Sequence, residues 1–199
     1  DAINEANIDL TSRQEVQIKT HFSDEQILDK EKLTAFLNDI EYPVTFLDFE
    51  AIQSVVPPYP GISPYQQLPF QFSAHIQSHK DATPQHIEFI TDLQSDPRPD
   101  FAKALAEKLP TIGTVFIYGG GFELSTTKGL ASQFSSHSQS LMDLHHRMKD
   151  LIIPFEQRLI YTKEMKGSLS FKDILPALVP DYTYQSLEIA NGQMVSTAS

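Results

Sequence analysis

The chain has 199 residues, 40% hydrophobic and 21% charged, which is typical of a soluble globular domain rather than a disordered segment. It has no cysteine and no apolar run of bilayer-spanning length, so disulfides, thiolate nucleophiles, zinc–thiolate sites and membrane insertion are excluded from the expected functions. The formal net charge of −11 argues against nucleic-acid binding through a broad basic face, but bound metal cations could supply positive charge locally.

The N-terminal residues 1–30 are polar and have few apolar anchors. We interpret them as a tail or linker from a missing upstream region, with an extended stretch and a turn within residues 13–33. They lack the basic and apolar regions of a signal peptide. The absence of cysteine leads us to expect a cytoplasmic location. Asp29 is suited to cap a helix from Lys30 to about Ile40, whose apolar residues share one face.

Three successive strands are predicted next. Residues 44–49, VTFLDF, are nearly all apolar, so this strand is expected in the middle of a sheet. Residues 69–77 alternate apolar and polar side chains, as a half-buried strand does, and residues 85–91 form a third short strand. Strands that follow one another in this way favour an antiparallel meander.

The second half of the chain alternates helix and strand signals. Residues 99–110 predict an amphipathic helix ended by proline, and residues 114–119 predict a fourth, apolar strand. Helices are expected over 122–134 and 140–155, and residues 166–180 predict a loop that opens into a short helix. This order indicates an α/β domain with a mixed sheet.

Two carboxylates end the first strand. Asp48 and Glu50 are two residues apart, so a strand projects both from one face while Phe49 points to the other. Neighbouring carboxylates repel each other in a low-dielectric site, and Mg²⁺ or Mn²⁺, which take oxygen ligands, would compensate them. A solvated acidic turn is the alternative, and it is the commoner origin of so short a pattern.

A third acidic residue follows the fourth strand. Gly119, Gly120 and Gly121 permit a close backbone approach, and Phe122 and Glu123 then begin a helix. Packing of Phe122 would hold Glu123 toward the end of the neighbouring strand. The alternative is a flexible turn with a favourable acid in the first helical turn. No Lys-Ser/Thr pair follows the glycines, so a phosphate-binding P-loop is excluded.

Taken in chain order, these features resemble the DEDD-type 3′-to-5′ exonucleases of the ribonuclease H-like superfamily. The chain is more closely similar to a bacterial domain family with an ordered set of motifs. The matching stretches are FLDFE at 46–50, PYQQLPFQFSAH at 64–75, YGGGFE at 118–123 and KGSLSFKDILPALVP at 166–180. The resemblance extends over about residues 30–192.

This resemblance implies a ribonuclease H-like mixed five-stranded sheet, an antiparallel meander plus parallel strands, flanked by helices. The exonuclease-type domain would span residues 31–199 and be incomplete at its C-terminus. Asp48 and Glu50 would bind two divalent metal ions, Mg²⁺ or Mn²⁺, and Glu50 would also orient the attacking water. Glu123 would bind a metal directly or through water. The implied reaction is hydrolysis of a phosphodiester at the 3′ end of DNA or RNA.

Two departures from the family pattern keep a second interpretation open. Gly119 stands where related sequences usually have Asn, and the last motif, expected as Tyr-x-x-x-Asp, would lie beyond residue 199. His146 and Asp150 fit the spacing of a His-type last motif, and Asp173 fits it less well. The alternative is a catalytically degenerate module that binds nucleic acid or a protein partner. The sequence indicates no oligomeric state.

Overall fold

The computed structural model describes residues 9–23 and 25–182, which form two compact units. The sheet unit is residues 40–151, and the helical unit combines the described residues before position 40 with those after position 151. Residues 1–8 of the predicted tail and residues 183–199 of the predicted domain lie outside the described residues.

The sheet unit contains five strands in the spatial order β4-β3-β2-β5-β6. Antiparallel pairing joins β2 to β3 and β3 to β4, and parallel pairing joins β2 to β5 and β5 to β6. The predicted α/β fold, with an antiparallel meander plus parallel strands as in a ribonuclease H-like sheet, is confirmed. The strands are β2 (Val44–Ile52), β3 (Leu68–Gln77), β4 (Gln85–Ile90), β5 (Val115–Ile117) and β6 (Met148–Asp150).

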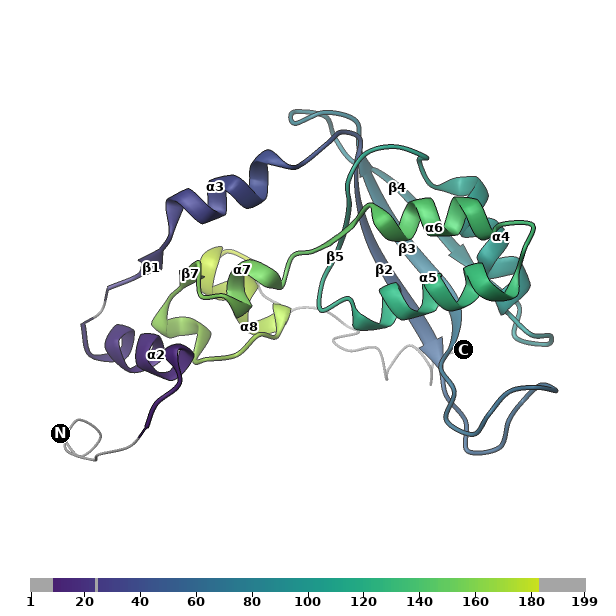
Figure 1. Ribbon diagram of the computed structural model, residues 1–199, viewed down its shortest axis with the longest axis horizontal. Coiled ribbons are helices and arrows are strands. Elements are labelled where there is room, and N and C mark those ends of the chain that lie inside the picture. The colour runs from purple at the N-terminus through teal and green to yellow at the C-terminus, as the bar shows by residue number, and fades with distance from the viewer. Residues whose placement is uncertain (1–8, 24, 183–199) are drawn as a thin grey trace. The chain divides into compact units, whose positions relative to one another are not determined.

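Three helices cover one face of this sheet (Figure 1). They are α4 (Arg98–Lys108), α5 (Gly121–Gln133) and α6 (Ser138–His146). Phe101 of α4 is completely buried, and its ring centroid lies 5.1 Å from that of Phe49 on β2 and 5.8 Å from that of Phe72 on β3. Edge-to-face aromatic packing of this kind fixes the rotation of β2, so its alternate residues must face the side away from the helices.

The expected continuous helix over residues 140–155 is interrupted, because residues 147–152 are not helical and a separate short helix begins at Ile153. Helix α6 ends at His146, and β6 then pairs in parallel with β5. The Arg147 guanidinium donates hydrogen bonds to the carbonyls of Pro110, Ile112 and Gly113, which anchors the entry to this strand. Pairing with β5 therefore overrides the helical pattern of a segment too short to show its own alternation.

The helical unit also corrects a prediction. The sequence predicts an extended stretch followed by a turn within residues 13–33, but α2 (Ser12–Ser23) occupies the first half of that segment. The predicted helix after Asp29 is confirmed, because the Asp29 carboxylate accepts a hydrogen bond from the Lys32 amide at the start of α3. The other elements are α3 (Lys30–Asn38), β1 (Ile27–Leu28), α7 (Ile153–Glu156), β7 (Ile160–Tyr161), a 3₁₀ helix (Lys163–Met165) and α8 (Phe171–Leu178).

Within residues 9–23 and 25–182, no helix combines the length and the apolar character that a bilayer requires.

Candidate functional site

Strand β2 presents Asp48 and Glu50 on the face that α4 and α5 do not cover. Phe49, between them, is buried on the helix-covered face, so the alternation expected from the sequence is confirmed. Asp48 is exposed and lies opposite Ser73 of β3, and Glu50 is half-buried opposite Gln71. The register shifts directly after Glu50, where the β2–β3 pairing is irregular. Such irregularities re-aim side chains at the end of a strand.

The turn after β5 delivers Glu123 to the same end of β2. Strand β5 runs parallel to β2, and α5 begins two residues after Gly119. Phe122 packs against Phe49, with ring centroids 6.4 Å apart, as the sequence predicted. Glu123 is only 6% exposed. A buried carboxylate is costly unless it is paired, so its surroundings decide what the site can do.

Asp150, at the end of β6, holds this turn in place. One carboxylate oxygen accepts the Gly119 amide at 2.9 Å, and the other accepts the Gly120 amide at 2.7 Å. Gly119 has φ of 64°, a left-handed conformation that glycine adopts without strain. A Cβ at position 120 would lie 2.1 Å from Cδ1 of Ile117. The local backbone and packing therefore explain why glycine occupies positions 119 and 120. The Asp150 carboxylate positions the start of α5.

Asp48 interacts electrostatically with both of the other candidate acids. Burial raises the pKa of Asp48, and burial together with the Asp48 charge raises the pKa of Glu50. Burial also raises the pKa of Glu123, with further contributions from the charges of Asp48 and Asp150. The Phe49 amide acts in the opposite sense on both Asp48 and Glu123. Both carboxylates therefore lie near the backbone of the same β2 residue, which places the acids in one neighbourhood.

We tested whether these acids fit a divalent metal. Among the described residues, no group of three or more His, Asp or Glu side chains is close enough to enclose an ion as the side chains stand. In the same part of the chain, no Lys, Arg or His forms an ion pair with Asp48, Glu50 or Glu123. Uncompensated carboxylate oxygens are suitable ligands for Mg²⁺ or Mn²⁺. The donor chemistry fits, and binding would require the side chains to turn inward.

Asp150 and Asp173, the alternative fourth ligands, have structural partners. Both oxygens of Asp150 are engaged by the glycine turn. Asp173 belongs to the helical unit, where its carboxylate accepts a 2.6 Å hydrogen bond from Ser168. The His146 ring lies beside that of His145, with centroids 5.7 Å apart. The pattern His146-x-x-x-Asp150 therefore spans a helix end and a strand end.

The raised carboxyl pKa values predict a pH-dependent stability. A carboxyl whose pKa is higher in the folded state binds protons more readily there, so its contribution to stability falls as pH rises above its ordinary value of 3.8 for Asp48. We expect Asp48→Asn to raise the melting temperature of the metal-free chain, and to do so more at pH 7 than near pH 4. Thermal unfolding of both proteins across that range checks this. If the melting temperatures of the two proteins differ by the same amount at every pH, the raised pKa assigned to Asp48 is contradicted.

Comparison with known proteins gives one family match. A family model described as "Domain of unknown function (DUF2779)" matches residues 45–170, more than half of the chain. The matched region begins in β2, includes Asp48, Glu50 and Glu123, and ends just before α8. No curated protein and no solved structure matches the chain.

Proposed function

The chain belongs to this DUF2779 family, and we propose that it is a divalent-metal-dependent nuclease, a 3′-to-5′ exonuclease that hydrolyses phosphodiesters of DNA or RNA by a two-metal mechanism. The observation that carries the proposal is the buried carboxylate of Glu123. It lies near Asp48, and neither has a cationic partner in the described part of the chain. Mg²⁺ or Mn²⁺ would compensate this negative charge.

Each acid has a distinct task in this proposal. Asp48 and Glu50 would hold the ions, which would stabilise charge on the attacking and leaving oxygens. Glu50, half-buried at the end of β2, would also accept a hydrogen bond from the attacking water and so orient it. Glu123 would hold an ion directly or through water from the N-terminus of α5. A cytoplasmic location is part of the same proposal.

The net charge of −11 shapes how substrate would bind. An acidic protein repels a phosphate backbone unless cations screen or bridge the two. We therefore expect both the affinity for nucleic acid and its cleavage to depend on the divalent ion. This distinguishes the proposed enzyme from a basic nucleic-acid-binding domain, whose affinity falls as salt is added.

The direct test is an incubation with 5′-labelled single-stranded DNA and RNA oligonucleotides in Mn²⁺ or Mg²⁺. The proposal predicts a ladder of products shortened from the 3′ end, which disappears when the ions are chelated. A matched oligonucleotide whose last 3′ linkage is a phosphorothioate should be shortened more slowly. If neither DNA nor RNA is cleaved with either ion, the proposed activity is wrong.

The degenerate, non-catalytic module remains the second candidate function. It is favoured by Gly119, where the resemblance to the exonucleases leads us to expect Asn, and by the open arrangement of the acids. On this alternative the site would bind nucleic acid or a protein partner without cleavage.

Calorimetric titration with Mn²⁺ separates the two candidates. A working site should give saturable heat in the micromolar-to-millimolar range. We expect Glu123→Gln to weaken that binding about tenfold or more, because metal sites lose roughly this much even when outer partners are removed. Asp81→Asn, an exposed acid in the turn between β3 and β4, is the matched control and should leave the affinity unchanged. No saturable heat with the unaltered chain favours the non-catalytic module.

A further inference from the structure

A cavity of about 230 Å³ lies between the end of the β2–β3 loop, the start of β3, the start of α4 and one face of α5. Phe122, which precedes Glu123, lines it, and so does Pro69, whose β2 partner is Ala51, the residue after Glu50. The cavity wall is therefore built partly from the chain segments that carry Glu123 and Glu50.

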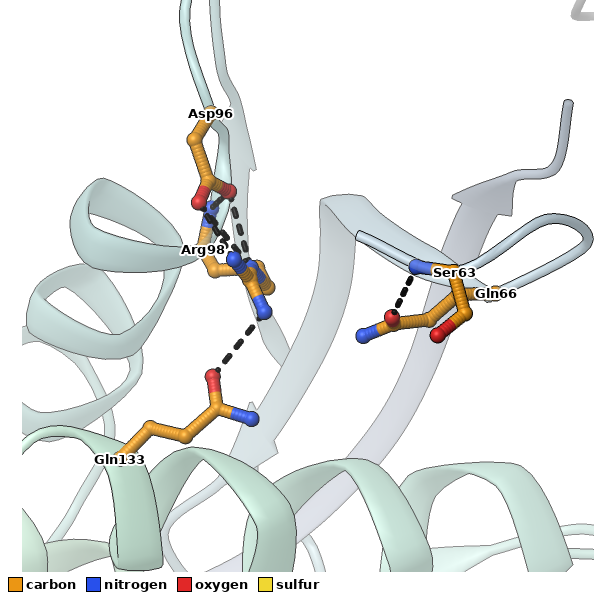
Figure 2. Close-up of polar contacts among 5 residues, drawn as sticks. All are labelled: Ser63, Gln66, Asp96, Arg98 and Gln133. Carbon is orange, nitrogen blue, oxygen red and sulfur yellow. Dashed lines mark hydrogen bonds and ion pairs between the residues drawn. The ribbon is translucent and has the colours of Figure 1, made fainter. Parts of the chain in front are cut away.

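Hydrogen-bond donors face this cavity from two sides. The Gln66 side-chain oxygen accepts the Ser63 amide at 3.1 Å, and the Gln133 side-chain oxygen accepts Nη1 of Arg98 at 3.1 Å. With their oxygens engaged, both side chains have Nε2 left to donate. Figure 2 shows the two Nε2 atoms directed toward the space between Gln66 and Gln133. The ligand that fits must therefore offer acceptors.

The cavity is close to electrically neutral. The Arg98 guanidinium forms a two-point ion pair with Asp96, with Nε to Oδ1 at 2.9 Å and Nη2 to Oδ2 at 2.7 Å (Figure 2). The Arg98 side chain is only 15% exposed, so this charge is already compensated where it is buried. A phosphate would need an uncompensated cation in a chain of net charge −11. A neutral ligand with carbonyl acceptors fits better.

Gly129 leaves room for such a ligand. It lies inside α5, where glycine is less favourable for helix stability than alanine. A Cβ built at this position meets no atom within 4 Å, so packing inside the chain does not require the glycine. Because Gly129 lines the cavity, its missing side chain enlarges the space that a ligand can occupy.

We propose that this cavity binds one unpaired nucleobase of the substrate strand, with preference for thymine or uracil, through hydrogen bonds from Gln66 and Gln133 to the base carbonyls. The inference rests on the proposed nuclease function. Thymine and uracil offer two carbonyl acceptors on a small ring, whereas adenine offers an amino donor. The Ser125 hydroxyl lines the same cavity and donates to the Phe122 carbonyl, which leaves its oxygen as an acceptor for the ring N–H.

Fluorescence anisotropy with short single-stranded oligonucleotides tests this, with Ca²⁺ in place of the ions proposed for cleavage. The full chain should bind oligo(dT) about tenfold more tightly than an abasic oligonucleotide of the same length and more tightly than oligo(dA). Gly129→Leu, which fills the cavity, should abolish both preferences, and Gln133→Leu should abolish the preference over oligo(dA). Gln139→Leu, on the exposed side of α6, is the control that should retain both.

The outcomes separate this inference from the nuclease proposal. Base-dependent binding without any cleavage in Mn²⁺ supports the cavity's role and removes the proposed enzyme. Cleavage with equal affinity for base-containing and abasic strands supports the enzyme and overturns the cavity's role. Absence of oligonucleotide binding, including the case in which the cavity takes a peptide, also overturns it. Circular dichroism of each variant confirms that it is folded, and Gln133→Leu, at an exposed position, provides the test if Gly129→Leu does not fold.

Discussion

Replacement of Asp48 by alanine should reduce Mn²⁺-dependent cleavage by about 10³-fold or more and leave the fold intact. The expected loss is large because a metal that polarises a phosphodiester contributes several kcal/mol to the barrier, and each 1.36 kcal/mol is tenfold in rate. Although Asp48 is exposed as a whole residue, partial loss of water around its carboxyl raises its pKa, so the folded state gains little from its charge. The metal-free variant should therefore melt at the same temperature as the unaltered chain or a few degrees higher.

The cleavage assay on oligonucleotides measures this loss, and thermal unfolding measures the stability. Asp81→Ala removes the same charge from an exposed turn of the same unit and should change neither quantity. Unchanged cleavage by the Asp48 variant contradicts the proposed mechanism. A large fall in its melting temperature would instead assign Asp48 a structural role.

Replacement of Asp150 by alanine should lower the free energy of unfolding by about 2–4 kcal/mol. The variant loses two hydrogen bonds from backbone amides to a carboxylate, each worth about 1.5–3 kcal/mol, with some compensation by water because the site is partly open. The amides of Gly119 and Gly120 then lose the acceptor that shapes the turn, so α5 and Glu123 are released from their positions. Cleavage should fall together with stability.

Asp150→Asn is the matched variant because it keeps one acceptor oxygen and removes the charge. Denaturant unfolding should give it an intermediate loss of stability. Since the Asp150 charge raises the pKa of Glu123, either variant should lower that pKa. If Asp150→Ala is as stable as the unaltered chain, the carboxylate does not hold the turn as described.

The strands that carry the acids were predictable from the sequence. VTFLDF is apolar and rich in β-branched and aromatic residues, and residues 69–77 alternate cleanly, so local pattern and tertiary burial agree. Phe49 between Asp48 and Glu50 also predicted which face each side chain takes. The resemblance then added the fifth strand, which the pattern of residues 140–155 concealed.

Two elements could not be found by periodicity. Strand β6 is three residues long, and it exists because Met148–Asp150 pairs with β5, which is more than 30 positions earlier in the chain. Helix α2 did have a local signal. The Thr11 hydroxyl accepts the Gln14 amide at 3.4 Å and Gln14 Oε1 accepts the Thr11 amide at 2.9 Å, a capping box that the polar composition of the segment obscured.

The sequence predicted which residues form the candidate site, but not the interactions that hold them in position. Asp48, Glu50 and Glu123 came from motifs, and in the structure Asp48 interacts electrostatically with Glu50 and with Glu123. Asp150 was considered only as a possible ligand, because spacing alone does not reveal that its oxygens bind the glycine turn. The cavity beside Phe122 depends on side-chain rotamers from three elements, and no sequence pattern encodes it.

The most direct measurement of the central claim is the anomalous scattering of Mn²⁺ in a crystal of the full chain soaked at saturating concentration. The account predicts one or two peaks, about 4 Å apart if both sites fill, with oxygens of Asp48, Glu50 and Glu123 about 2 Å from the ions or joined to them by water. Well-ordered density for these three side chains with no manganese among them would contradict it.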